Sequence, residues 1–235
     1  TLETGASPAG ISINRQGNLA LVANRGEGTV SIFTISGKTV SGLGKIAVGP
    51  ANGGPSHVAI TPDGKMALVT RDGDSYISVL SIDGTKVEYT KRDMVPGLRP
   101  IVMDVASTGA FAIVGHLAGG ATGDSDAVTL MDLTAKPPRV VDTVGALGST
   151  AEGLKIAPDG SVVAVVWPQA ATPNARTAAT PAARPNLIFV IGIYPSSQRR
   201  YCDAWRHLEQ GKPEWQDSPN AVGNAYLHKS ESHLR

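Results

Sequence analysis

The chain has 235 residues, a net charge of +1 and an isoelectric point of about 7.8, and this length suffices for one large domain or two small ones. The balanced charge gives no global field that would draw the protein to nucleic acid or to an anionic membrane. The longest apolar runs are far shorter than the roughly 20 residues of a transmembrane helix, and the single cysteine, Cys202, excludes an internal disulfide and a cysteine-based zinc cluster.

The start of the chain and its cysteine content bear on processing and location. The first residue is Thr1 rather than methionine, and no charged-then-apolar signal segment follows it. We therefore expect a processed or truncated product. One cysteine suits an exported protein as well as a cytoplasmic one, so we expect a periplasmic or extracellular location and leave a cytoplasmic one open.

Four segments of the sequence share one pattern: a short apolar alternation, a turn, and a second apolar alternation. They are GISINRQGNLALV (10–22), HVAITPDGKMALV (57–69), VMDVASTGAFAIV (102–114) and GLKIAPDGSVVAV (153–165). The turn glycines are Gly17, Gly64, Gly109 and Gly160, with spacings of 47, 45 and 51 residues. Internal similarity at such a period indicates a repeat architecture.

Further strands follow each hairpin along the chain. We expect a third strand at 29–35, 76–82, 127–133 and 186–194, and a fourth at 45–49 and 87–95. Four short strands in about 45 residues, with a glycine turn at a fixed place, are typical of a β-propeller blade. A β-sandwich contains similar hairpins, but it does not require a register that recurs four times.

We therefore predict an all-β fold, a propeller of four-stranded antiparallel blades at about 6–53, 54–97, 98–148 and 149–194. Propellers have four to eight blades, and this chain supplies four. Either four blades close a ring, or the chain is a segment of a larger ring that a partner chain would complete.

The repeats also resemble a known family. The pattern P-x-x-(V/I)-x-(I/V)-x-P-D-G-x-x-A-x-V, followed by a short loop and V-S-(V/I), resembles the YVTN-type repeat. It is similar to the seven-bladed lactonase-like propellers, the group that contains 6-phosphogluconolactonase and carboxymuconate-lactonizing enzymes. The resemblance covers about residues 6–194 and implies this architecture. The activity that it implies is hydrolysis or isomerisation of a lactone.

Two regions depart from the repeat. Residues 170–185 are an Ala-, Pro- and Thr-rich insertion, which we interpret as a loop of the fourth blade. Residues 196–235 form an atypical tail without alternating strands, in which Tyr201, Trp205 and Leu208 have helical spacing and predict one short helix. The tail either caps the edge of the fourth blade or is foreign sequence from a frameshift or truncation.

Polar residues recur at one end of the predicted blades. The loop that enters a blade and the loop between its second and third strands lie at the same end. The position after the second strand is occupied in turn by Asn24, Arg71, His116 and Trp167. Loops at this end add Arg25, His57, Arg99 and Glu152. We therefore expect these side chains to surround one mouth of the channel.

These residue types suit a small anionic molecule or lactone. Arginine binds a carboxylate with two parallel hydrogen bonds, and a histidine near neutrality can take or give a proton. We predict His57 and Glu152 as catalytic residues. The predicted substrate-binding residues are Arg71, His116, Arg99, Arg25, Asn24 and Trp167. The family resemblance implies a His/Arg/Glu site at the same mouth.

A structural interpretation of the same residues stays open. Polar residues at strand ends are ordinary in loops, and the three arginines can equally be solvated or paired with Glu27, Asp72 or Asp74. Strand alternation also directs His57 and Glu152 to opposite blade faces. We expect no cofactor and no metal, because the Asp/Gly turns at 72–75 and 123–126 lack the EF-hand spacing. No basic stripe with interleaved aromatics indicates nucleic-acid binding.

Three hypotheses for function follow. The first is a lactonase-like propeller that binds a small anionic ligand at the channel mouth and hydrolyses or isomerises a lactone. The second is a non-catalytic exported propeller that acts as a binding or scaffold module. The third is a truncated product without activity of its own.

Overall fold

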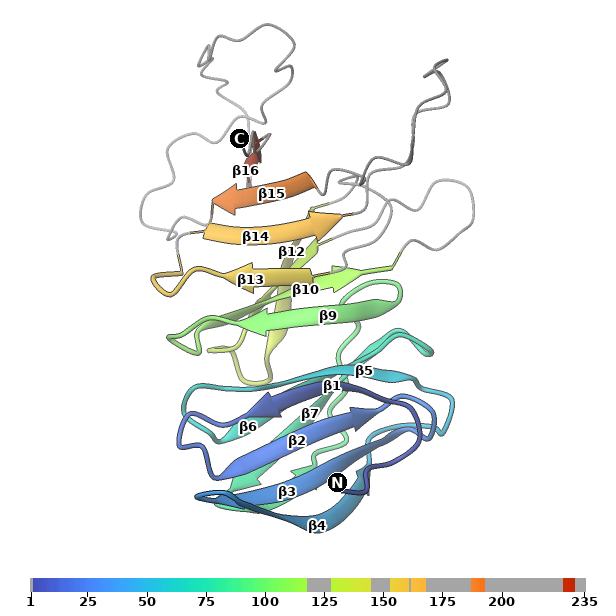
Figure 1. Cartoon of the computed structure of the whole chain (residues 1–235). Coiled ribbons are helices and arrows are strands. Elements are labelled where there is room, and N and C mark those ends of the chain that lie inside the picture. Colours follow the sequence, from blue (N-terminus) through green and yellow to red (C-terminus); the bar gives the residue numbers. More distant parts are fainter. Residues whose placement is uncertain are drawn as a thin grey trace, which may run out of the picture.

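The computed structural model describes residues 2–117, 128–144, 153–160, 162–167, 187–192 and 226–230. The regular elements in these residues are strands, and this part of the chain contains no helix that could cross a membrane. The strands form four antiparallel sheets of four (Figure 1). The predicted all-β architecture of propeller blades is therefore confirmed for the described residues.

The first two blades run in chain order from their inner to their outer strand. Blade one consists of β1 (Pro8–Ile13), β2 (Leu19–Asn24), β3 (Thr29–Ser36) and β4 (Thr39–Ala47). Blade two consists of β5 (Pro55–Ile60), β6 (Met66–Arg71), β7 (Tyr76–Asp83) and β8 (Lys86–Tyr89). Each strand pairs antiparallel with the next one in sequence, as the hairpin pattern predicts.

The other two blades have the same strand order. Blade three consists of β9 (Pro100–Val105), β10 (Phe111–His116), β11 (Val128–Asp132) and β12 (Arg139–Val144). Blade four consists of β13 (Gly153–Ile156), β14 (Val162–Trp167), β15 (Leu187–Gly192) and β16 (Tyr226–Ser230).

Strand β16 corrects the expectation that the tail 196–235 contains no strand. It pairs antiparallel with β15, from Ile188 opposite Ser230 to Gly192 opposite Tyr226, and completes blade four. The insertion at 170–185 and the short helix predicted around 201–208 lie outside the described residues.

The four turn glycines have one conformation and one hydrogen bond. Their φ angles are 70°, 70°, 73° and 74°, the left-handed region that glycine adopts without steric cost. Each glycine N–H donates to the carbonyl oxygen three residues earlier, at 2.8–2.9 Å. A methyl group added at Gly109 would meet Pro62 of blade two at 3.5 Å, and one at Gly160 would meet Phe111 of blade three at 3.6 Å. Neighbouring turns therefore lie side by side, as a radial repeat requires.

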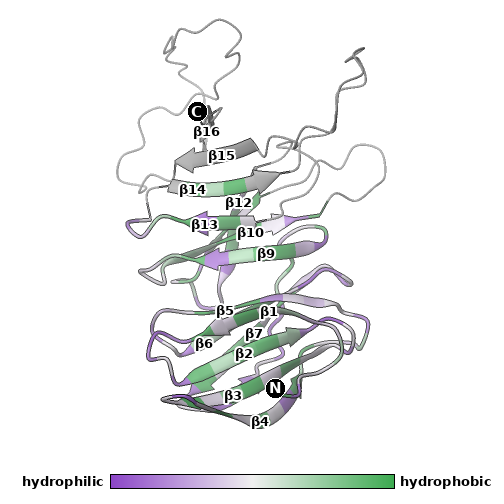
Figure 2. Cartoon of the chain, in the orientation of Figure 1, coloured by the Kyte–Doolittle hydropathy of each residue, from purple (hydrophilic) through white to green (hydrophobic). Residues whose placement is uncertain are grey.

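Clusters of buried apolar side chains lie between consecutive blades, and Figure 2 shows hydrophobic residues along their strands. Blade two shows how the alternation of a strand serves two interfaces. Ala67 and Val69 of β6 pack in the cluster shared with blade one, whereas Leu68 between them packs in the cluster shared with blade three. Because successive side chains of a strand point to opposite faces, blades two and three bury both faces, and their strands are rich in Val, Leu, Ile and Ala.

A polar contact recurs between inner strands of consecutive blades. Ser12 Oγ accepts a hydrogen bond from the backbone N–H of Ile60 at 3.1 Å, and Asp104 Oδ2 accepts one from the N–H of Ile156 at 2.9 Å. Ser12 and Asp104 each lie five residues before their turn glycine, while Ile60 and Ile156 lie four residues before theirs. The blades are therefore related by one repeated geometry, in addition to their shared sequence pattern.

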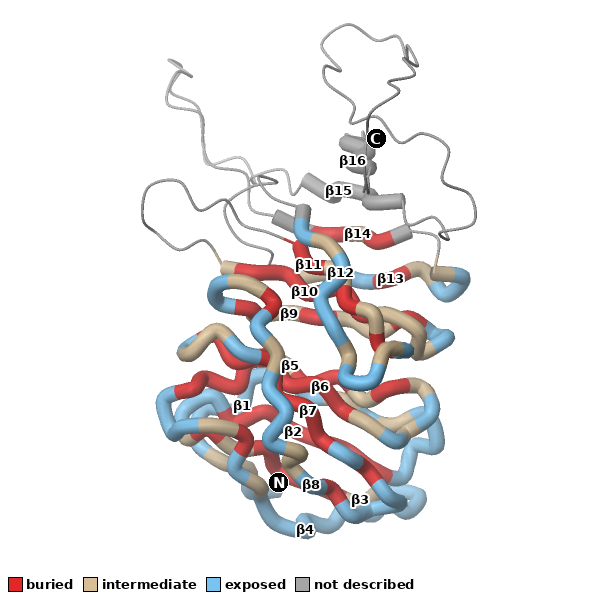
Figure 3. Tube along the Cα trace, turned by 180° about the vertical axis from the view of Figure 1, so that it is seen from behind, coloured by how far each residue is buried: buried red, intermediate tan, exposed pale blue. Residues whose placement is uncertain are grey.

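The four blades form an open arc in the described residues. The inner strands contact one another in the order β1, β5, β9 and β13, and Figure 1 shows β1 and β13 well apart. Ile11 of β1 is 62% exposed, whereas Val58, which has the same place in blade two, is 1% exposed against blade one. The first face of blade one therefore lacks the neighbour that the equivalent face of every later blade has. Figure 3 shows the contrast between the buried middle strands and the exposed outer strand β4.

Matched substitutions at equivalent positions test this arrangement. Val58→Asp places an unpaired carboxylate in the core between blades one and two and is expected to cost more than about 3 kcal/mol of unfolding free energy. Ile11→Asp changes an exposed side chain and is expected to cost less than about 1 kcal/mol. Urea denaturation measures both, and equal losses would contradict the open first face of blade one.

Candidate functional site

Three of the predicted substrate-binding residues lie inside the blades. Asn24, Arg71 and His116 end the second strands β2, β6 and β10, and all three are buried. We call them the clamp residues, because each binds both the linker that enters its blade and a hydroxyl-bearing residue on the third strand.

Asn24 shows the smallest version of this clamp. Its Nδ2 donates to Thr29 Oγ1 and to Ser31 Oγ, both at 2.9 Å, and both partners belong to β3. Its Oδ1 accepts a hydrogen bond from the N–H of Gly5 at 3.0 Å, in the segment that leads into β1. The amide therefore ties the incoming chain to the far side of the same blade.

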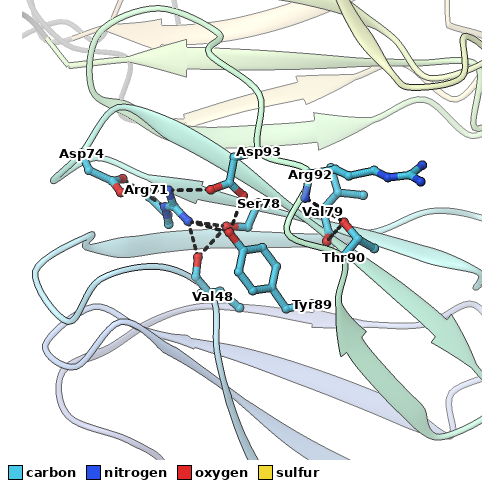
Figure 4. Close-up of polar contacts among 9 residues, drawn as sticks. All are labelled: Val48, Arg71, Asp74, Ser78, Val79, Tyr89, Thr90, Arg92 and Asp93. Atoms are coloured by element: carbon cyan, nitrogen blue, oxygen red, sulfur yellow. Dashed lines mark hydrogen bonds and ion pairs between the residues drawn. The ribbon is translucent and has the colours of Figure 1, made fainter.

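Arg71 makes the densest network of the three (Figure 4). Its guanidinium pairs with Asp74 at 2.8 Å and with Asp93 at 3.0 Å. One nitrogen also donates to Ser78 Oγ at 2.8 Å and to the carbonyl oxygen of Val48, in the linker into blade two. All three nitrogens of the guanidinium are therefore engaged by protein groups.

His116 completes the series with an imidazole. Its Nδ1 lies 2.8 Å from the carbonyl oxygen of Leu98, and its Nε2 lies 2.9 Å from Thr129 Oγ1. Since a carbonyl oxygen only accepts, Nδ1 is the donor in the contact with Leu98. Thr129 Oγ1 donates in turn to the carbonyl oxygen of Pro96, so the linker into blade three is held twice. Burial lowers the pKa of His116 below 6.5, against the opposing effect of the Leu98 carbonyl.

A glycine in each incoming linker makes room for its clamp residue. A methyl group at Gly5 would meet Asn24 at 2.6 Å, one at Gly49 would meet Arg71 at 2.4 Å, and one at Gly97 would meet His116 at 3.0 Å. This recurring fit explains the clamp residues as structural parts of the repeat. The candidate site is therefore built from the other predicted residues.

Arg25, Asp72 and Arg99 meet at the loop end of blades one to three, and we call them the loop-end cluster. Asp72 lies in the β6–β7 loop and is 4% exposed, whereas both arginines are nearly half-exposed. Arg25 binds the carboxylate through two nitrogens, Nε at 3.1 Å and a terminal nitrogen at 2.5 Å. Arg99 lies 3.6 Å from the same carboxylate, and Ser56 Oγ donates to it at 2.5 Å.

The backbone of Arg99 is held in a strained conformation. Its φ is 48°, and Ser7 and Gly54, at the same place before the first proline of blades one and two, have φ of 51° and 64°. For a residue with a Cβ, this left-handed region costs about 1–2 kcal/mol, and strained residues of this kind cluster at functional sites. The N–H of Arg99 donates to Ser75 Oγ at 3.0 Å, which fixes the turn beside the cluster.

His57 lies on inner strand β5, directly after Ser56, and is partly buried. Burial lowers its pKa below 6.5, while the charge of Asp104 acts to raise it and that of Lys155 to lower it further. Asp104 of β9 and Lys155 of β13 form an ion pair at 2.9 Å. The neutral imidazole thus lies in the field of a charged pair from the next two inner strands.

Asp104 and Lys155 were missed by the sequence analysis. Both lie five residues before their turn glycine, where blades one and two have Ser12 and Ala59. A charge on an inner strand at a repeat position that is otherwise small was the available signal. Of the remaining predicted residues, Glu152 lies outside the described residues, and Trp167 is placed only as the last residue of β14. The described residues contain no cluster of His, Cys, Asp and Glu suited to a metal ion.

Residues 1–100 match the family model described as Lactonase, 7-bladed beta-propeller. The matched residues cover blades one and two. This match confirms the resemblance to the lactonase-like propellers, while no curated protein matches the chain.

Solved structures share the fold at low identity. Hydrazine synthase from Kuenenia stuttgartiensis is 22% identical, with a TM-score of 0.62 over 80% of this chain and 51% of that chain. A candidate 6-phosphogluconolactonase from Bacteroides uniformis is 12% identical, with a TM-score of 0.65 over 82% and 55%. A periplasmic gluconolactonase from Pseudomonas aeruginosa is 15% identical, with a TM-score of 0.58 over 81% and 51%. The chain spans about half the length of these structures.

The clamp role of Arg71 predicts a large stability loss on its removal. Arg71→Ala removes a buried guanidinium and leaves the partly buried Asp74 and Asp93 without their cation, and it is expected to cost about 3–5 kcal/mol of unfolding free energy. The control Arg139→Ala removes an exposed arginine that lies 3.6 Å from Asp132 and is expected to cost less than about 1 kcal/mol. Equal, small losses in urea denaturation would mean that Arg71 is not a clamp.

The buried imidazole of His116 predicts a pH dependence of stability. Because the unfolded chain binds a proton on this ring more readily than the folded chain, stability falls as the pH drops below about 6.5. His116→Asn keeps an N–H donor for Leu98 but does not titrate, so its unfolding free energy should fall less between pH 7.5 and 5.5. Identical pH dependence in the two proteins would show that His116 titrates normally in the fold.

Proposed function

We propose that the chain binds a small anionic lactone, or the acid formed from it, at the loop-end cluster, and that it opens the lactone by hydrolysis. One observation carries the proposal: two half-exposed guanidinium groups from different blades converge on a single buried carboxylate. The lactonase family match of residues 1–100 supports lactones as the substrate class.

The charge and donors of the cluster suit an anion. Asp72 neutralises one of the two arginines, so the three side chains together keep one positive charge. Arg25 uses Nε and one terminal nitrogen on Asp72. Among the described residues, the guanidinium of Arg99 is held only by an ion pair of 3.6 Å, a distance too long for a hydrogen bond, so its side-chain N–H groups remain for a ligand. Guanidinium groups bind carboxylates with charge-assisted hydrogen bonds.

His57 can supply the base for hydrolysis. Its lowered pKa keeps the imidazole neutral at pH 7, the form that accepts a proton. In this step His57 takes a proton from water while the water oxygen bonds to the lactone carbonyl carbon. The ring C–O bond then breaks, and the proton returns from His57 to the leaving oxygen, which gives a hydroxy acid. A guanidinium group of the loop-end cluster would stabilise the oxyanion of the tetrahedral intermediate.

Variants at the cluster and at His57 separate binding from turnover. Arg99→Gly suits the left-handed backbone, as Gly54 does in blade two, and is expected to weaken binding of muconolactone or 6-phosphogluconate about ten- to hundredfold by calorimetry. His57→Gln is expected to keep this binding and to lower lactone hydrolysis about a hundredfold or more in a pH-stat assay.

Arg139→Ala is the control for loss of positive charge, and it should change neither quantity. Unchanged affinity in Arg99→Gly would refute the binding site. Binding by the wild type without turnover of any lactone would refute hydrolysis and favour the non-catalytic binding module.

A further inference from the structure

Exposed apolar side chains border the loop-end cluster. Val95 is 65% exposed, Leu98 is 54% exposed and Tyr76 is 38% exposed. We call these three residues the apolar rim. Val95 and Leu98 lie in the linker between β8 and β9, four residues and one residue before Arg99, and Tyr76 begins β7.

Backbone contacts hold the three residues of the rim together. Ile77 and Met94 exchange two hydrogen bonds, at 2.8 and 2.9 Å, which places Val95 beside the start of β7. The N–H of Arg99 donates to Ser75 Oγ, which brings the end of the linker to the same turn. Residues 94–99 therefore run alongside residues 75–77, and Arg99 lies at one end of this segment.

The rim is exposed on a backbone that is fixed. The carbonyl oxygens of Pro96 and Leu98 accept hydrogen bonds from Thr129 and His116 of blade three. The guanidinium carbon of the buried Arg71 lies 5.3 Å from the centroid of the Tyr76 ring, which is a cation–π contact. The exposure of these side chains is therefore not explained by a mobile backbone. Each side chain leaves apolar surface in contact with water, which is unfavourable in free energy.

We propose that the apolar rim takes the hydrophobic part of the ligand whose anionic group binds Arg99 and Arg25. The occupant is a carboxylate that carries an aryl or alkyl group, in preference to a fully hydroxylated sugar acid. This inference rests on the proposed anion site, because Leu98 and Arg99 are consecutive and offer an apolar and a cationic contact to one small molecule.

Ligand-observed NMR titrations with four carboxylates test the proposal. Phenylacetate and hexanoate are expected to bind about tenfold more tightly than acetate and gluconate, because apolar surface leaves water on the rim. The double variant Val95→Ser, Leu98→Ser is expected to lose most of this tenfold difference. The control Leu43→Ser, Val141→Ser changes exposed apolar residues of β4 and β12 and should keep it.

The outcomes distinguish the two proposals. If none of the four acids binds, or if Arg99→Gly leaves all four affinities unchanged, the anion site itself is wrong. If all four bind equally and Arg99→Gly weakens all of them, the anion site stands and the rim is refuted. Loss of the tenfold difference in the control variant would also refute the rim.

Discussion

The structure depends on sheets that bury both of their faces. In β6, Ala67 and Val69 pack toward blade one and Leu68 packs toward blade three, so a single strand serves two interfaces. With both faces occupied, the strand ends, their loops and partly exposed residues of the inner strands, such as His57, are left for chemistry. Ile11 supports the same rule: it is exposed, and it lies on the one described inner strand that no earlier blade covers.

The loops can hold a site because the clamp residues fix where each linker enters its blade. Asn24, Arg71 and His116 differ in size and charge, yet each binds an incoming linker and the third strand of its own blade. The linker into blade three, held by His116, is the one that carries Arg99 in its strained conformation. Stability and candidate chemistry therefore lie on neighbouring residues with separate roles, and the loop-end cluster inherits its geometry from the clamps.

Periodicity predicted the blades well, and it selected only part of the candidate site. Alternation and turn glycines located the hairpins, since local side-chain direction determines both. Strand β16 was missed, because YLHKS has weak alternation and its partner β15 lies far back in the sequence.

Arg25, Arg99 and His57 were selected from their strand ends, and Asp72 was named as a possible ion partner. The same reasoning grouped the clamp residues with them. A repeat position specifies the end of the blade, but it does not say whether a long polar side chain turns outward or back onto its own linker. The recurrence of a polar residue at one position in each blade favoured a structural role, whereas Arg25 and Arg99 have no arginine at the equivalent positions of the other blades.

One measurement tests the division between clamps and site most directly. The Nε–H signals of individual arginines can be followed by NMR while a small carboxylate is added. The account predicts that the signals of Arg25 and Arg99 shift with saturation while that of Arg71 stays in place, because Asp74 and Asp93 already occupy its guanidinium. A shift of Arg71, or constant signals for both Arg25 and Arg99, would contradict it.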